Sequence, residues 1–168
     1  MKLVADAAPL IFLAKINQLR LLNTLFKSEI VIPSVVADEI LSEGTPPDEE
    51  RLLKAFLPEC RIVKIKRPDS FASALSYADN SILTLSVREK AEIVASDDKL
   101  LRRIALVEGF RVIGTLGILI QARKSSQLYP KDAAKLLNEL VGEHNFRIST
   151  RVYAAARMAI LHEDNFTP

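Results

Sequence analysis

Hydrophobic residues follow two patterns along the chain, and the two patterns alternate. Short runs rich in Val, Ile, Leu and Ala predict β-strands. These runs lie at residues 2–5, 29–32, 61–66, 92–96 and 111–114. In the 61–66 run apolar and charged residues alternate, which indicates a half-exposed strand at an edge of the sheet.

Segments with apolar residues three or four positions apart lie between these strands and predict helices. They are residues 9–16, 19–26, 34–43, 70–90 and 99–109, followed after the last strand by 115–125, 130–144 and 149–163. Pro33 is suited to open a helix as its first residue, and Gly109 to close one. Residues 43–50, "EGTPPDEE", combine turn residues with acids and predict an exposed loop.

Strands that alternate with helices predict an α/β fold, a three-layer α/β/α sandwich with a mostly parallel central sheet. The helical segments after the last strand are extra C-terminal helices. The sequence has no internal repeat and no sharp break in composition. We therefore expect a single domain over residues 1–168, with a core of about 2–125 and a helical extension of about 126–162.

Composition narrows the class of protein. The 168 residues are 49% hydrophobic and carry a net charge of +2, which fits a folded domain and is too mild to indicate a nucleic-acid partner. The single cysteine, Cys60, excludes an intramolecular disulfide, as suits a reducing cytosol. No apolar run approaches the ~18 residues of a membrane span. We expect a soluble cytoplasmic protein with no membrane partner.

Acidic residues stand where two predicted strands end. Asp6 follows the first strand, and Asp97 and Asp98 follow the strand at 92–96. In open parallel sheets the functional site lies beyond the carboxyl ends of the strands. If these two strands are neighbours, their acids are neighbours too.

Two acids within predicted helices face apolar neighbours by spacing. Glu39 lies four residues after Val35, and Asp79 lies four residues after Leu75. A carboxylate on the apolar side of a helix needs a partner, because a buried unpaired charge is very costly. No His, Arg or Lys has the helical spacing to pair with Asp79, so a divalent cation is a natural partner.

Ligands that are all oxygen favour Mg²⁺ or Mn²⁺ over zinc. The only histidines, His144 and His162, are far along the chain from the acids, which argues against a histidine-based zinc site. Mg²⁺ is usually held by carboxylates, waters and substrate phosphates. An acid cluster around such an ion therefore suggests phosphodiester chemistry.

The chain resembles PIN-domain ribonucleases of the kind found as VapC-type toxins in toxin–antitoxin pairs. The resemblance covers roughly residues 2 to 125 and rests on the segments "LVADAAPLI", "IPSVVADEI", "YADNSILTL" and "VASDDKLLRRIA". It implies that one set of four acids is both catalytic and metal-binding, and we call this set the acid site. Its members are Asp6, Glu39, Asp79 and Asp98, with Asp97 as an auxiliary metal ligand.

This resemblance also implies an activity and partners. The protein is expected to be an endoribonuclease that uses Mg²⁺ or Mn²⁺ to hydrolyse RNA, leaving 5′-phosphate and 3′-hydroxyl ends. If two ions bind, they should lie roughly 3.5–4 Å apart. A homodimer and an antitoxin whose tail blocks the acidic pocket are implied as well. Ala7 and Ala8 depart from the family pattern, which often has a small polar residue there.

Several residues near the acids have candidate supporting roles. Ser96 is placed to hydrogen-bond a carboxylate or a metal-bound water. Lys99, Arg102 and Arg103 share a helical face and are candidates for binding RNA phosphates. Thr115 opens a predicted helix, where it would either cap the helix or help to bind a phosphate.

Structural explanations and rival functions remain open at this point. Asp6, Asp97 and Asp98 each precede a predicted helix and are suited to cap it, and Glu39 is suited to a solvated surface. One rival function is a non-catalytic PIN-like module that binds RNA or protein. The other is an Asp-nucleophile phosphatase, which needs Asp-x-Asp after the first strand, where this chain has Ala8 in the third position.

Overall fold

A computed structural model of the protein describes residues 1–162. Its centre is a five-stranded sheet in the order β3-β2-β1-β4-β5, in which every neighbouring pair is parallel. The strands are β1 (Lys2–Ala5), β2 (Glu29–Pro33), β3 (Arg61–Val63), β4 (Ile93–Ala95) and β5 (Arg111–Ile113). The α/β fold with a parallel sheet is thus confirmed.

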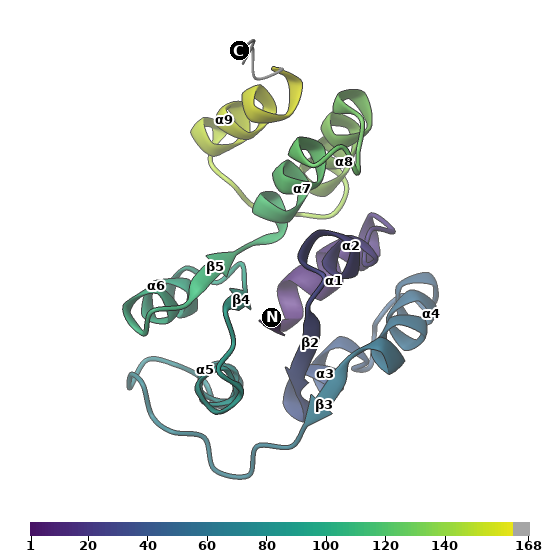
Figure 1. The fold of residues 1–168 in the computed structure, drawn as a ribbon. Helices are drawn as coiled ribbons and strands as arrows, with labels where there is room; N and C mark the ends of the chain where they lie inside the picture. Colours follow the sequence, from purple (N-terminus) through teal and green to yellow (C-terminus); the bar gives the residue numbers. More distant parts are fainter. Residues whose placement is uncertain (163–168) are drawn as a thin grey trace.

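Helices cover both faces of the sheet and form a group of their own at the C-terminal end (Figure 1). Those that follow β1 and β2 lie on one face: α1 (Ala7–Lys15), α2 (Leu21–Phe26), α3 (Ser34–Ile40) and α4 (Pro47–Phe56). On the other face lie α5 (Tyr77–Glu89), which packs against β1 and β2, and α6 (Lys99–Val107), which packs against β5. The last three helices pack against one another: α7 (Thr115–Lys124), α8 (Pro130–Gly142) and α9 (Thr150–Leu161).

The strand order reverses direction between β1 and β4. From β1 the chain proceeds outward to β2 and β3, and then crosses back through α5 to β4 and β5. A doubly wound sheet forms a crevice where this reversal occurs, and ligands bind there, beyond the carboxyl ends of the strands. Asp6 and Ser96 are the first residues after β1 and β4. The topology therefore places them at the switch point.

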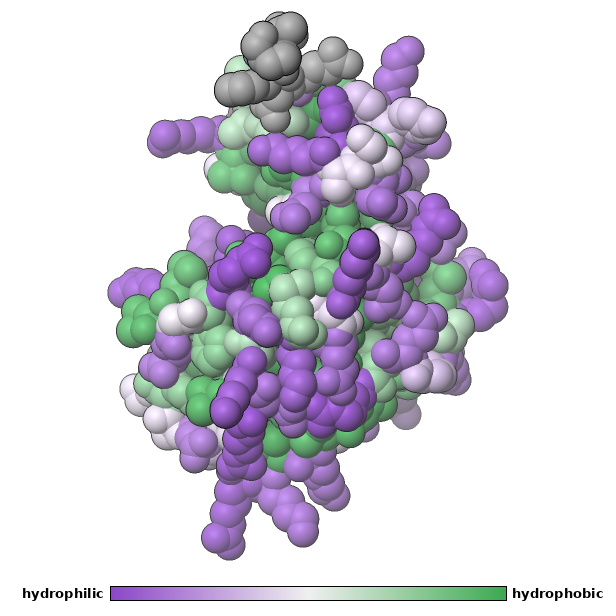
Figure 2. All heavy atoms as spheres, in the orientation of Figure 1, coloured by the Kyte–Doolittle hydropathy of each residue, from purple (hydrophilic) through white to green (hydrophobic). Residues whose placement is uncertain are grey.

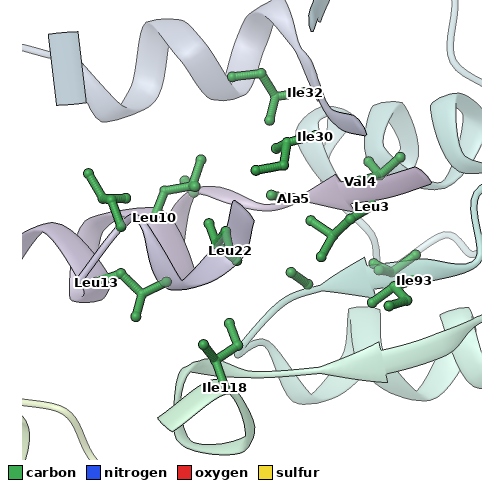
Figure 3. Close-up of a cluster of buried hydrophobic side chains, with 14 of the residues drawn as sticks. Leu3, Val4, Ala5, Leu10, Leu13, Leu22, Ile30, Ile32, Ile93 and Ile118 are labelled. Atoms are coloured by element: carbon green, nitrogen blue, oxygen red, sulfur yellow. The ribbon is translucent and has the colours of Figure 1, made fainter. Parts of the chain in front are cut away.

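The core explains why β1 is central. Leu3, Val4 and Ala5 are fully buried, and β1 has a paired strand on each side, so this short apolar run has no face in water. Leu10 of α1, Leu22 of α2 and other large side chains lie around it (Figure 3). Full burial of one such side chain contributes about 1.5–3 kcal/mol. This packing fixes the position of the residue that follows β1, Asp6.

Several elements differ from the sequence prediction, mostly by a few residues at one end. β3 ends at Val63 and lies at an edge, as expected, but residues 64–66 are not strand. The helix predicted over 70–90 begins only at Tyr77. It starts there because the side chains of Ser76 and Asp79 each accept a hydrogen bond from the other's backbone N–H. A further helix, α4, begins at Pro47 inside the predicted loop. Pro at the first position and acids in the first turn favour this start.

The remaining expectations concern single residues and the C-terminal end. Pro33 is the last residue of β2 and the residue before α3, not the first of the helix. Burial raises the pKa of the Cys60 thiol to about 12, as suits a structural role. No helix within residues 1–162 is long and apolar enough to cross a membrane. Glu163, the end of the predicted last helix, lies outside the described residues.

Candidate active site

The ends of β1 and β4 are joined by hydrogen bonds at the sheet edge. The Asp6 backbone N–H donates to the carbonyl oxygen of Ala95 (2.9 Å), and the Ser96 hydroxyl donates to Asp6 Oδ2 (2.8 Å). Ser96 is fully buried, and its Oγ also accepts a bond from the Asp98 N–H (3.1 Å). One hydroxyl thus fixes the Asp6 carboxylate and the backbone that leads into α6.

Asp6 is a carboxylate in an unfavourable place. It caps the start of α1 by accepting a bond from the Ala7 N–H (2.7 Å). Its pKa is nevertheless raised to about 6: burial raises it most, the bonds from Ser96 and Ala7 lower it, and the charges of Asp79 and Glu39 add a smaller rise. Asp6 therefore caps α1, as its position before a predicted helix suggested. Its surroundings nevertheless disfavour its charged form.

Glu39 and Asp79 reach the same region from helices on opposite faces of the sheet. Glu39 is exposed on α3. Asp79 is half-buried in the first turn of α5, where its Oδ2 accepts bonds from the Ser76 N–H (2.9 Å) and hydroxyl (2.7 Å). The spacing from Leu75 that suggested a shared helical face does not apply, because Leu75 precedes the helix. Both carboxylates are close enough for their charges to act on Asp6.

Asp98 is an exposed N-cap. Its Oδ1 accepts a bond from the Leu101 N–H (2.8 Å) at the start of α6. Its charge is not among those that shift the pKa of Asp6. Asp98 therefore lies beside the switch point, but its charge affects the pKa of Asp6 less than the charges of Glu39 and Asp79 do.

Asp97 faces α7. Its two carboxylate oxygens accept bonds from the backbone N–H (2.8 Å) and the hydroxyl (2.6 Å) of Thr115. Burial raises the pKa of Asp97, while these bonds and the charge of Arg102 lower it. The cap residue of α7 is Gly114, not Thr115, and a carboxylate already occupies this helix N-terminus. Of the two roles considered for Thr115, a phosphate contact is thus taken by the carboxylate of Asp97.

The basic face of α6 consists of Lys99, Arg102 and Arg103. Lys99 and Arg103 are exposed, whereas Arg102 is half-buried near Asp97. Lys99 and Arg102 line a cavity of about 850 Å³ between α6, α7 and the segment before α9. Arg103 is not among its lining residues. Two of the three residues therefore lie on one concave surface next to the switch point.

Comparison with known proteins identifies the family. A family model described as a PIN domain, DUF3368, matches residues 2–160. The chain belongs to the PIN-domain family. The match includes α7, α8 and nearly all of α9, so the C-terminal helices are part of this family's domain.

A solved structure agrees with this fold. The PIN domain described here is similar to a PilT N-terminus domain protein from the hyperthermophilic archaeon Sulfolobus solfataricus P2, with a TM-score of 0.53 and 14% sequence identity. The similarity covers 70% of this chain and 90% of the other. At this identity it supports the fold alone. No curated protein matches the sequence.

PIN domains are typically nucleases and generally bind divalent metal ions. The question is whether the carboxylates of the acid site could hold such an ion. None of the ion pairs within residues 1–162 involves the acid site, which leaves its charges without a protein cation. Over the same residues, no three side chains of His, Cys, Asp or Glu are close enough to hold one ion together. Mg²⁺ needs only one or two carboxylates and keeps several waters. A site with Asp6 as one of its one or two carboxylates fits that requirement.

Sequence reasoning missed two partners in this region. Ser76 forms a capping box with Asp79, and the pattern "SYAD" at residues 76–79 could have indicated it. Thr115 binds Asp97 across a separation of eighteen positions. No local pattern indicates that pair, because it depends on the pairing of β4 with β5.

Proposed function

We propose that this PIN domain is an endoribonuclease that hydrolyses RNA phosphodiester bonds with Mg²⁺ or Mn²⁺. One observation carries the proposal: a half-buried carboxylate, Asp6, sits at the switch point with a raised pKa, two further carboxylates nearby and no ion pair to any cation within residues 1–162. Perturbed acids in such a crevice are typical of functional sites. A divalent cation would remove the repulsion that makes the arrangement unfavourable.

Each residue of the acid site has a separate role in the proposed reaction. Asp6 and Asp79 would hold the metal ion, Glu39 and Asp98 would add negative charge at the rim, and Ser96 keeps the Asp6 carboxylate in one orientation. A bound Mg²⁺ or Mn²⁺ activates water and neutralises charge on the phosphate. Asp97 anchors α7 through Thr115, and any further contribution to metal binding is an auxiliary one.

Phosphate binding is assigned to the basic face of α6. Its residues begin directly after Asp98, so a strand held there lies next to the acid site. Lys and Arg side chains bind the phosphate backbone without regard to sequence, and this contact orients the strand. The same helix thus supplies a carboxylate cap at its start and phosphate contacts along its side.

The biological setting is proposed from the resemblance to VapC-type proteins. In this proposal the protein is the toxin of a toxin–antitoxin pair, works as a homodimer in the cytoplasm, and is inhibited by an antitoxin protein. Co-expression with the product of an adjacent small gene tests the pairing, because an antitoxin should form a stable complex and suppress cleavage.

The activity is tested by incubating a mixed RNA pool with the protein and Mn²⁺, with EDTA as the control. Cleavage only with Mn²⁺, leaving 5′-phosphate and 3′-hydroxyl ends, is the expected result. Cleavage that persists in EDTA, or ends of 2′,3′-cyclic phosphate, would overturn the proposed chemistry.

A non-catalytic PIN-like module that binds RNA or protein is the second candidate. One observation favours it: Asp6, Asp79 and Asp98 each accept helix-capping hydrogen bonds, so each has a structural role without a metal. This candidate predicts RNA or protein binding that is unchanged by EDTA, and no cleavage under any metal condition.

A further inference from the structure

A second concave surface lies on the opposite side of Asp6 from the basic face of α6. It is a pocket of about 470 Å³ where β2 and β3 end. Its walls include Ser34 and Asp38 of α3, Lys64 and Lys66 after β3, and Tyr77 of α5. The same helices α3 and α5 carry Glu39 and Asp79. The pocket therefore shares two of its walls with the acid site.

The sheet order sets the distance between the pocket and Asp6. β3 is two strands from β1, and neighbouring strands lie about 4.8 Å apart, so their ends are roughly 10 Å apart. Across the carboxyl edge the order is thus lysines after β3, carboxylates around β1, and the basic face of α6 after β4. With a divalent cation bound among the carboxylates, an RNA strand along this edge would meet positive charge at all three places.

Tyr77 is presented as a rigid aromatic surface. Its side chain is half exposed (51%), although its hydroxyl donates to the carbonyl oxygen of Ile65. The hydrogen bond fixes the ring over the segment that carries Lys64 and Lys66, and leaves part of the ring open. An aromatic ring that is fixed and solvent-exposed is suited to stacking, because little rotamer freedom is lost on binding.

The segment between β3 and α5 is also held in place. The Asp69 N–H donates to Thr84 Oγ1 (2.8 Å), and the Phe71 N–H donates to Asn80 Oδ1 (3.0 Å). Figure 2 shows hydrophilic side chains projecting over this connection at the lower end of the molecule. Neither Lys64 nor Lys66 takes part in an ion pair with any residue from 1 to 162. Their charges are therefore available to a ligand, with Asp38 as the one opposing carboxylate of the lining.

We propose that this pocket binds the RNA strand on one side of the cleaved bond, with a base stacked on Tyr77 and phosphates bound by Lys64 and Lys66. Combined aromatic stacking and cationic contacts are how proteins hold single strands without sequence preference. The inference rests on the proposed nuclease function and adds to it that the substrate is single-stranded at this position, since a base inside a duplex is stacked on both faces and has no free face for the ring.

Binding of a short fluorescent single-stranded RNA in EDTA tests the pocket without cleavage. Tyr77→Ala should weaken binding roughly 5- to 100-fold, the loss of one stacked base. Tyr77→Phe keeps the ring and loses only the hydroxyl bond to Ile65, so it should bind more weakly than the parent but clearly more tightly than Tyr77→Ala, which separates stacking from folding. The double variant Lys64→Ala/Lys66→Ala should lower the log–log salt slope by about 1.4, or about 0.7 per contact.

The matched control is Lys131→Ala/Lys135→Ala, which removes the same charge from α8 and should leave the slope unchanged. Parental binding by Tyr77→Ala, or equal slopes for the two lysine pairs, would overturn the inference. So would displacement of the RNA by polyglutamate at equal charge concentration, which would assign the pocket to acidic protein segments. If the parent cleaves RNA but the pocket variants bind normally, only the pocket is wrong. If pocket variants lose binding but the parent never cleaves, only the nuclease proposal is wrong.

Discussion

Replacing Asp6 with Asn should stabilise the metal-free protein at neutral pH, although it removes a residue proposed to be essential. The pKa of Asp6 is raised from 3.8 to about 6. One pKa unit corresponds to about 1.4 kcal/mol, so the charged form is disfavoured by roughly 3 kcal/mol. Asn keeps the size but its oxygen accepts only one of the bonds from Ala7 and Ser96, and losing the other costs about 1 kcal/mol. The expected net gain in unfolding free energy is about 2 kcal/mol.

The stability advantage of Asp6→Asn should depend on pH, and its direction follows from the raised pKa of Asp6. The pKa of Asp6 is higher in the folded state than in the unfolded chain, so between about pH 4 and pH 6 the folded state binds more protons. The contribution of Asp6 to stability therefore falls as the pH rises through this window and stays low above it. The advantage of Asp6→Asn should be full near pH 7 and vanish below about pH 4.

Urea denaturation in EDTA measures both effects, with Asp98→Asn as the matched control. Asp98 is also a helix N-cap, but it is exposed, and Asn caps as well as Asp does, so its replacement should change stability little. Saturating Mn²⁺ should then favour the parent over Asp6→Asn, because a ligand of the folded state stabilises it by mass action. A destabilised Asp6→Asn at pH 7, or a difference that does not change with pH, would refute the reasoning.

Three further outcomes are expected. Ser96→Ala removes a bond that lowers the pKa of Asp6, so an NMR titration of this carboxyl should show a still higher pKa; an unchanged value would remove Ser96 from its positioning role. Gly114→Ala should destabilise the fold by about 1–3 kcal/mol, because an added Cβ would lie 2.6 Å from side-chain atoms of both Asp97 and Arg102. The control Gly142→Ala, where nothing lies within 4 Å of the added Cβ, should be neutral or slightly stabilising, and thermal denaturation measures both. Alanine at the three positions of the basic face of α6 should flatten the salt dependence of RNA binding by about 0.7 in log–log slope per lost contact, and an unchanged slope would leave that face without a phosphate role.

The alternation of strands and helices could be predicted from the sequence because each pattern is local. The central strand has one polar residue, Lys2 at its start, followed by three apolar residues that are buried on both faces, and Asp6 follows them directly. The placement of acids at strand ends then follows from parallel topology alone. The sequence therefore predicts which residues lie at the switch point.

Contacts that depend on helix capping, or on residues far apart in the sequence, could not be predicted from it. The spacing from Leu75 predicts that Asp79 shares a helical face with it, yet the helix starts after Leu75, and Asp79 is placed by its capping box with Ser76. The approach of Asp97 to Thr115 and of Tyr77 to Ile65 depends on how separate segments pack. Helical periodicity carries no information on either contact.

Binding of Mn²⁺, followed by the EPR signal of the free ion, tests the central claim most directly. The account predicts saturable binding of Mn²⁺ by the parent, and loss of that binding in Asp6→Asn. Asp48→Asn, which removes an exposed acid from the first turn of α4, should bind as the parent does. Equal binding by the parent and Asp6→Asn would contradict the claim that the carboxylate at the end of β1 holds the metal.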